Sequence, residues 1–217
     1  MNRREEFGFE LVWINEPFKS LEDIAAELEN DVVLGATRTG LRTEGEYLIF
    51  ADGSSIRFSQ FAKPEEIHWK NEVEWIFECS GKFTDRNEAE RHLRWKIDRV
   101  FISATSMNAD NMVILGLNDK NYNVEQDKII SYGSCTINGF MPIAGLLEKK
   151  FGITEAGLNV THNTPLKDIK NAFSTILRRT CTLEYVGPIL MPVLKDRFFV
   201  NYHLVTYPGV SLMDLQF

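Results

Sequence analysis

The sequence predicts a protein of the α/β class with an open parallel sheet, and three observations support this. Short apolar runs alternate with segments of helical periodicity, and three of these strand-like runs are Phe9–Asn15, Glu74–Cys79 and Arg99–Ser103. The composition is globular, with 217 residues of which 44% are hydrophobic and 25% charged, so the chain can bury a core. No apolar run reaches the ~18 residues of a membrane-spanning helix.

Charge and cysteine content narrow the classes of function. The chain has 24 Lys and Arg against 31 Asp and Glu, a net charge of −7, and no basic block, which disfavours nucleic-acid or membrane partners. The start at Met1–Glu6 lacks the apolar run of a secretory signal. Cys79, Cys135 and Cys181 lie far apart without a Cys-x-x-Cys motif, so we expect neither disulfides nor a metal site. We therefore expect a soluble cytoplasmic protein.

The first part of the chain has the pattern of a parallel sheet that carries a hairpin. Phe9–Asn15 is a strand, and Ser20 with Asp23 caps the helix that follows it. A period-two pattern around the turn Asp52–Gly53 predicts a hairpin. The other predicted elements are the hairpin strands Glu46–Phe50 and Ser55–Phe58, the strands Glu74–Cys79, Arg99–Ser103, Met112–Leu117 and Lys128–Ser131, and the helix Asn87–Lys96.

The pattern changes after Ser134. Cys135–Lys150 has a continuous apolar side and predicts a long helix. Beyond it we expect a helix at Pro165–Leu177 and strands at Gly157–His162 and Phe198–Tyr207. We place the domain boundary at the start of the long helix, which gives domains 1–133 and 134–217.

Cys135 is the residue whose position is most informative, because it lies in the first turn of a helix that follows a strand. Free backbone N–H groups and the helix dipole favour a thiolate at such a position and could also hold an oxyanion. A lone cysteine is more often a small buried apolar residue, so both roles remain open from this position alone.

Ser134-Cys135-Thr136-Ile137-Asn138 resembles the Ser-Cys-Thr-Thr-Asn active-site motif of phosphorylating glyceraldehyde-3-phosphate dehydrogenases. Further segments resemble that family in the same order along nearly the whole chain: Ile14–Phe18, Phe77–Thr84, Arg99–Ser106, Gly157–His162 and Val205–Leu215. The resemblance implies an α/β fold with a depleted Rossmann-like sheet that lacks its first strand, over residues 1–133. A shortened α+β catalytic domain would follow, over residues 134–217.

The resemblance also implies roles for individual residues. Cys135 would be the nucleophile, and His162, 27 residues later, the base that activates it, so that an aldehyde or acyl substrate forms a thioester. Ser134, Thr136 and Thr180 would bind an anionic group. The residues that would contact a cofactor are Glu16, Ser80, Gly81, Ser103 and Thr105.

The sequence departs from the family at two sites. No Gly-x-Gly-x-x-Gly motif precedes Phe9, so we expect no cofactor, or NAD bound only weakly. Leu204 stands where the family has an arginine for the substrate phosphate, and His203 beside it has no guanidinium fork.

Arg178 and Arg179 precede Thr180. We expect both side chains to be exposed to solvent, and the alternative is that they contact an anion.

These observations lead to two functional hypotheses. The first is a cysteine-thioester enzyme that transfers or hydrolyses an acyl group, or retains some aldehyde oxidation. The second is a non-catalytic paralogue that serves as an assembly or regulatory subunit. We also expect a homo-oligomer, because exposed sheet edges favour association. The strand Phe9–Asn15 is expected to pair directly with Glu74–Cys79, the alternative being a strand donated by a partner chain.

Overall fold

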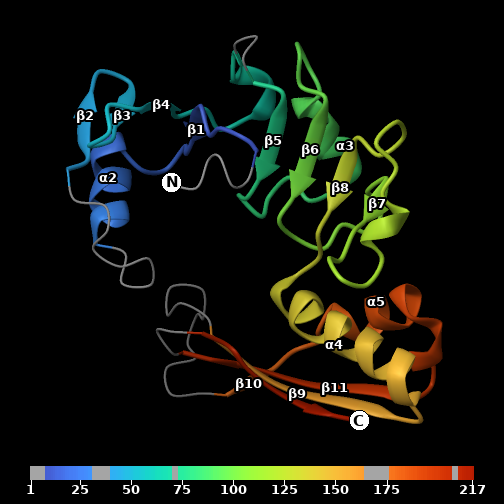
Figure 1. The fold of residues 1–217 in the computed structure, drawn as a ribbon. Helices are drawn as coiled ribbons and strands as arrows, with labels where there is room; N and C mark the ends of the chain where they lie inside the picture. The colour runs from blue at the N-terminus through green and yellow to red at the C-terminus, as the bar shows by residue number, and fades with distance from the viewer. Residues whose placement is uncertain (1–7, 31–39, 70–72, 164–175, 207–209) are drawn as a thin grey trace. The chain divides into compact units, whose positions relative to one another are not determined.

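The computed structural model describes residues 8–30, 40–69, 73–163, 176–206 and 210–217. The chain divides into two compact units (Figure 1). Unit 1 contains Met1–Ile76 with Glu90–Arg99, and unit 2 contains Phe77–Ala89 with Val100–Phe217. Helices alternate with strands, and a parallel sheet is present, so the predicted α/β class is confirmed.

Unit 1 is built on a four-stranded sheet and one helix. The sheet has the order β1-β4-β3-β2, in which β1 is parallel to β4 and the hairpin β3–β4 is antiparallel. The helix α2 begins after Ser20, which forms the predicted capping box with Asp23. Leu21 of α2 packs against Leu48 and Phe58 of the sheet. The bounds are β1 Trp13–Asn15, α2 Leu21–Glu29, β2 Arg42–Glu44, β3 Tyr47–Ile49 and β4 Ser55–Ser59.

The expected direct pairing of the first strand with Glu74–Cys79 is wrong. Within the described residues, β1 pairs with β4 and lies in a different sheet from β5, Trp75–Glu78. Side chains explain the preference for β4, because Trp13 Nε1 donates to Ser59 Oγ at 2.9 Å and Asn15 Nδ2 to the Phe61 carbonyl at 2.9 Å. That another chain donates a strand stays a prediction.

A second four-stranded sheet has the order β5-β6-β8-β7, with β6 and β7 both parallel to β8. The predicted parallel sheet therefore exists, but it contains only the later strands of the first part. The predicted helix Asn87–Lys96 is mostly replaced by α3 and a short 3-10 turn, and the strand predicted at Met112–Leu117 ends at Met112. The bounds are β6 Arg99–Ile102, β7 Asn111–Met112, β8 Ile129–Ser131, α3 Arg86–Ala89, and 3-10 turns at Glu90–His92, Asp119–Asn121, Pro64–Glu66 and Pro192–Leu194.

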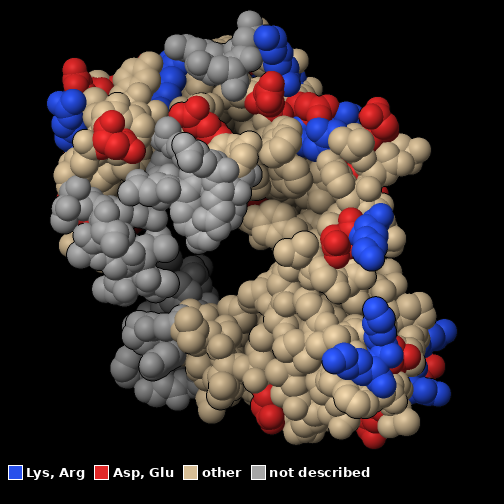
Figure 2. All heavy atoms as spheres, viewed as in Figure 1, with Lys and Arg blue, Asp and Glu red and all other residues tan. Residues whose placement is uncertain are grey.

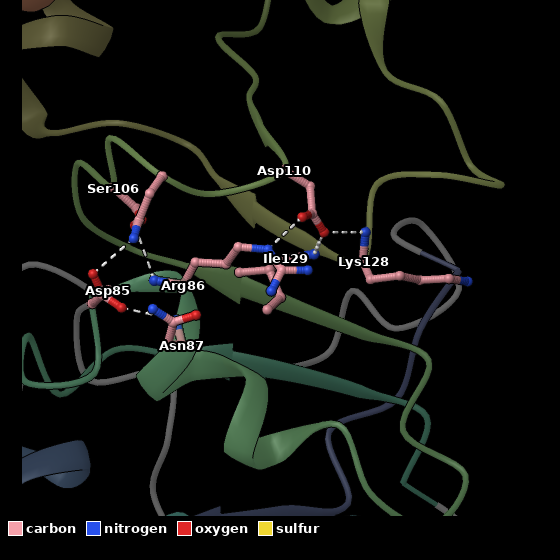
Figure 3. A network of polar contacts seen from close by, with 8 residues as sticks. Asp85, Arg86, Asn87, Ser106, Asp110, Lys128 and Ile129 are labelled. Atoms are coloured by element: carbon pink, nitrogen blue, oxygen red, sulfur yellow. Dashed lines mark hydrogen bonds and ion pairs between the residues drawn. The ribbon is translucent and has the colours of Figure 1, made fainter.

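A polar network joins α3 to the strands of this sheet (Figure 3). Asp110 is its centre: one carboxylate oxygen accepts from Arg86 Nε at 2.7 Å, and the other accepts the N–H groups of Lys128 and Ile129. The side chain of Asn108 donates to Asp85 and accepts the Arg86 N–H. These bonds hold the start of α3 beside the segment that leads into β8.

A third sheet, with the order β10-β11-β9-β12, lies in unit 2. The helices α4 and α5 cover one of its faces, where Phe140 contacts Phe198 and Phe217 (Figure 1). Phe140, Leu158, Leu183 and their neighbours form a buried hydrophobic cluster between these helices and the sheet. The bounds are α4 Cys135–Phe151, β9 Ala156–Asn163, β10 Leu177–Arg178, α5 Leu183–Leu190, β11 Phe198–Val205 and β12 Leu212–Gln216.

Two predictions for this part have different outcomes. The long helix and the strands on either side of residue 180 are confirmed as α4, β9 and β11. The helix predicted at Pro165–Leu177 lies mostly outside the described residues, and Leu177 itself belongs to β10. The predicted domain boundary at 133/134 lies between β8 and α4, inside unit 2, and it stays a prediction.

The described helices are all too short or too polar to cross a membrane. On the face shown in Figure 2, Lys and Arg side chains stand close to Asp and Glu side chains, and the described residues there form no continuous basic stripe.

Candidate functional site

The turn between β8 and α4 presents Cys135 to solvent. Gly133 turns the chain with a φ of +71°, a conformation that favours glycine. Ser134 is the N-cap of α4, and its Oγ accepts the N–H of Ile137 at 3.4 Å. Cys135 is therefore the first helical residue, as predicted, and it is exposed.

His162 on β9 lies beside this cysteine. The Cys135 Sγ atom is 3.3 Å from His162 Nε2. The other ring nitrogen, Nδ1, is 2.6 Å from the carbonyl oxygen of Asn163, which can only accept a hydrogen bond. A neutral ring with its proton on Nδ1 satisfies that carbonyl and directs the lone pair of Nε2 toward the sulfur. The ring can then accept the thiol proton.

Hydroxyl groups and a second thiol lie next to Cys135. Ser134 Oγ is 3.1 Å from Thr136 Oγ1, which in turn is 3.6 Å from Cys181 Sγ. Burial raises the pKa of the Cys181 thiol, and the hydrogen bond with Thr136 offsets this only in part. Thr180 directly precedes Cys181 and is exposed. The predicted residues Ser134, Thr136, Cys135 and His162 are thus close together, and the segment of Thr180 approaches them.

Tyr202 on β11 is a residue of this site that the sequence did not indicate. Its ring centroid lies 5.5 Å from that of His162. Burial raises the pKa of Tyr202 to about 12, with smaller contributions from Cys181 and Cys135, so the phenol stays protonated. Period two places Tyr202 on the same face of β11 as Val200, but the register of β11 against β9 is not visible in the sequence.

The residues predicted to contact a cofactor are found in both units, and each unit is described by itself. In unit 1, Glu16 follows directly after β1, and its Oε1 accepts the N–H of Phe18 at 2.9 Å. This leaves the second carboxylate oxygen available for a ligand hydroxyl. The carboxyl ends of parallel strands are where α/β sheets bind ligands.

In unit 2, four predicted residues follow the carboxyl ends of β5 and β6. The hydroxyl of Ser80 donates to the buried carboxylate of Glu78, so it is already engaged. Gly81 has a φ of +71°, and a Cβ there would meet no atom within 4 Å. Ser103 is hydrogen-bonded to Tyr132, whose pKa is raised by burial and by Cys79 despite that bond. Thr105 Oγ1 is buried and has no hydrogen-bond partner among the described residues.

The described residues contain no group of three or more His, Cys, Asp or Glu side chains that could hold a metal ion.

Comparison with known proteins identifies the relatives of this chain. Residues 2–86 match the family model "Glyceraldehyde 3-phosphate dehydrogenase, NAD binding domain". Glyceraldehyde-3-phosphate dehydrogenase 1 of Giardia intestinalis is 34% identical over 223 residues, which cover 96% of this chain and 65% of the relative. The cytosolic enzyme of Nicotiana tabacum is 31% identical over 222 residues, 95% of this chain and 67% of the relative. Glyceraldehyde-3-phosphate dehydrogenase 1 of Bacillus subtilis is 29% identical over 205 residues, 88% and 61% of the two chains.

These lengths mean that the chain spans less than two thirds of the Giardia and Bacillus relatives. The family match also corrects the cofactor expectation. We expected no cofactor because the glycine motif is absent before Phe9, but the matched model describes an NAD-binding domain, so that expectation is wrong. The glycine loop supplies only the pyrophosphate contacts of a dinucleotide. The matched region contains Glu16 and Gly81, and their contact with the cofactor stays a prediction.

Proposed function

The chain belongs to the glyceraldehyde-3-phosphate dehydrogenase family, and on this premise we propose that it oxidises a small aldehyde through a thioester on Cys135, with NAD as its cofactor. The single observation that carries the proposal is the 3.3 Å separation of Cys135 Sγ and His162 Nε2. It supports a nucleophile and base in direct contact, the arrangement that cysteine-dependent acyl chemistry requires. We propose a cytosolic location, as the name of the Nicotiana relative states for that protein.

The first step is a proton transfer. His162 Nε2 takes the proton of the Cys135 thiol, and the thiolate attacks the carbonyl carbon of the aldehyde. The C=O bond opens, and its oxygen becomes an oxyanion in a thiohemiacetal. The N–H of Ile137 is taken by the Ser134 cap, but the N–H groups of Cys135 and Thr136 in the first turn of α4 have no partner within the helix and can stabilise that oxyanion.

NAD fits the residues present. Thr105 Oγ1 is a buried hydroxyl without a described partner, and the open backbone at Gly81 leaves room for a ligand. Gly81, Ser103 and Thr105 of unit 2 are therefore the residues that would hold the cofactor in that unit. A cofactor contact of Glu16, which belongs to unit 1, stays a prediction. The chemistry that NAD supplies when bound is acceptance of a hydride, by which a thiohemiacetal is oxidised to a thioester.

The thioester is then cleaved. An acyl acceptor, water or another nucleophile, attacks the acyl carbon, the C–S bond breaks, and Cys135 leaves as the thiolate. His162 first releases the thiol proton to solvent, and its free Nε2 then takes the proton of the acceptor. The phenol of Tyr202, protonated up to about pH 12, adds no negative charge beside the thiolate.

The test uses the full chain with NAD and glyceraldehyde 3-phosphate, the compound in the names of the relatives, and follows NADH absorbance. Wild type should form NADH, and Cys135→Ser should abolish it. His162→Gln should lower kcat by a factor on the order of 10²–10⁴, the usual contribution of a general base. Cys79→Ser is the matched control and should leave the rate unchanged.

If no NADH forms and all three cysteines react equally with iodoacetamide, the result would instead favour the non-catalytic paralogue.

A further inference from the structure

Arg178 and Arg179 lie on opposite faces of the third sheet. The strands β10 and β11 are antiparallel, with Leu177 opposite Leu204 and Arg178 opposite His203. The N–H of Arg179 donates to the carbonyl oxygen of Tyr202 at 3.0 Å, which continues this register by one residue. Directly opposite residues of antiparallel strands project from the same face. Arg179 therefore shares a face with Tyr202, and Arg178 shares the other with His203.

The face that Arg179 shares is the one that carries the candidate site. Tyr202 contacts the ring of His162, and Leu204 lies opposite His162 in the parallel register of β11 and β9. The same face includes Leu158 and Val160, which belong to the core beneath α4. From Arg179 the chain runs through Thr180 to Cys181, whose sulfur is 3.6 Å from the hydroxyl of Thr136. Thr136 directly follows Cys135, so Arg179 starts the segment that borders the nucleophile.

The guanidinium of Arg179 is available for a ligand. The side chain is exposed, and the structure records no ion pair for it with any described residue. The carboxylate of Glu184, from the start of α5, accepts the N–H of Cys181 at 3.4 Å. An arginine without a carboxylate partner can bind a carboxylate or phosphate through two parallel hydrogen bonds.

We infer that Arg179 binds the anionic group of the substrate, a phosphate or carboxylate, while Cys135 attacks the carbonyl carbon at the other end. Arg179 is thus a specificity-determining residue: it selects an anionic aldehyde or acyl compound over a neutral one. This inference rests on the proposed function. It gives the chain a guanidinium near the site although Leu204 occupies the adjacent strand position opposite His162.

The test compares two alkylating reagents that react alike with a thiolate and differ in charge. Iodoacetate carries a carboxylate and iodoacetamide does not. The full chain is labelled at low ionic strength, and peptide mapping then measures the labelling of Cys135. Arg179→Gln should slow labelling by iodoacetate about three- to tenfold, because the variant loses one partly screened unit charge that attracts the carboxylate of the reagent. It should leave labelling by iodoacetamide within about twofold.

Matched variants identify the cause. Arg178→Gln removes the same charge from the opposite face and should leave both rates unchanged, whereas Arg179→Lys keeps the charge and should restore much of the iodoacetate rate. The preference for iodoacetate should also fall as salt is raised, because the screening length is ~8 Å at 0.15 M.

The outcomes separate this inference from the proposed function. An equal loss with both reagents in Arg179→Gln, or an equal iodoacetate loss in Arg178→Gln, overturns the role of Arg179 and leaves the Cys135–His162 chemistry standing. If iodoacetamide does not prefer Cys135 to Cys79, the proposed function fails, and the inference that rests on it fails as well.

Discussion

The Sγ atom of Cys135 lies 3.3 Å from Nε2 of His162, although the two residues are 27 positions apart and belong to α4 and β9. The contact depends on two local features: the turn at Gly133, which starts α4 beside the sheet, and the bond from the His162 ring to the Asn163 carbonyl. A change in the turn or in the His162–Asn163 bond should alter the reactivity of Cys135, although Cys135 itself is unchanged.

The three cysteines should react with iodoacetamide at different rates. Cys135 should react fastest, because it is exposed and beside His162, and Cys181 slowest, because it is 3% exposed and burial raises its pKa. His162→Gln should slow Cys135 about tenfold or more. The exposed His68, changed to Gln, is the control and should have no effect. Equal rates at the three sites by mass spectrometry would contradict the assignment.

Gly133→Ala should both destabilise the protein and disturb the site. The residue has a φ of +71°, and a Cβ would meet Ile114 Cδ1 at 2.9 Å and Ile137 Cγ2 at 3.1 Å. The combined strain and overpacking should cost about 2–4 kcal/mol in the free energy of unfolding, measured by urea denaturation. Gly116→Ala is the control: its φ of +82° is similar, and a Cβ would meet only Pro142 Cβ at 3.9 Å, an ordinary van der Waals contact, so about 1 kcal/mol is expected. Equal losses would show that packing at Gly133 is unimportant.

The ion pair of Asp110 should make stability depend on pH in the acid range. Burial alone would raise the pKa of Asp110, but the bonds from Arg86, Ile129 and Lys128 outweigh it and lower the pKa below 3.8 (Figure 3). The carboxylate therefore stabilises the fold above about pH 4, and this is lost as pH falls through the lowered pKa. Asp110→Asn should cost about 2 kcal/mol at pH 7. The gap to wild type should close as pH falls through the lowered pKa of Asp110, below 3.8.

The control for this experiment is Glu155→Gln, which neutralises an exposed carboxylate of the same unit. It should change the free energy of unfolding by less than about 0.5 kcal/mol at either pH. A loss in Asp110→Asn that does not shrink at low pH would mean that packing, and not charge, explains the effect.

Tyr202 should weaken the fold at alkaline pH. Burial raises its pKa from 10.0 to about 12, so between these values the folded protein holds the phenol proton while the unfolded chain has released it. The contribution to stability is therefore complete below pH 10 and falls as pH rises to 12. Tyr202→Phe should remove this slope, as thermal unfolding at pH 9 and pH 11 would show. If the difference in unfolding temperature between wild type and Tyr202→Phe is the same at pH 9 and at pH 11, burial does not raise the pKa of this phenol.

Local sequence signals predicted the elements whose determinants are close in the chain. The capping box of Ser20 and Asp23 is a contact over three residues, and it is present. The long apolar side of α4 also gave its length to within one residue. The pair Cys135 and His162 could be proposed only through a family pattern, because no local signal places β9 beside the start of α4.

Contacts between distant strands could not be predicted. The pairing of β1 with β4 depends on Trp13 and Asn15 reaching Ser59 and Phe61, more than forty residues away. Tyr202 contacts His162 only in one register of β11 against β9, and a shift of one residue would turn it to the other face. The helix α5 was missed; it contains Gly187 and Pro188, which weaken a helical pattern.

The division into two units has a practical consequence for spectroscopy. All four tryptophans, at positions 13, 69, 75 and 95, fall in unit 1, and all three cysteines, at 79, 135 and 181, fall in unit 2. Trp13 lies 5.3 Å from Trp69 with the Arg57 guanidinium over its ring, so its emission should respond to loss of this packing. Intrinsic fluorescence therefore reports melting of one unit, and the rate at which Cys181 becomes accessible to a thiol reagent reports the other. An unlabelled wild-type chain thus carries two separate reporters, one for each unit.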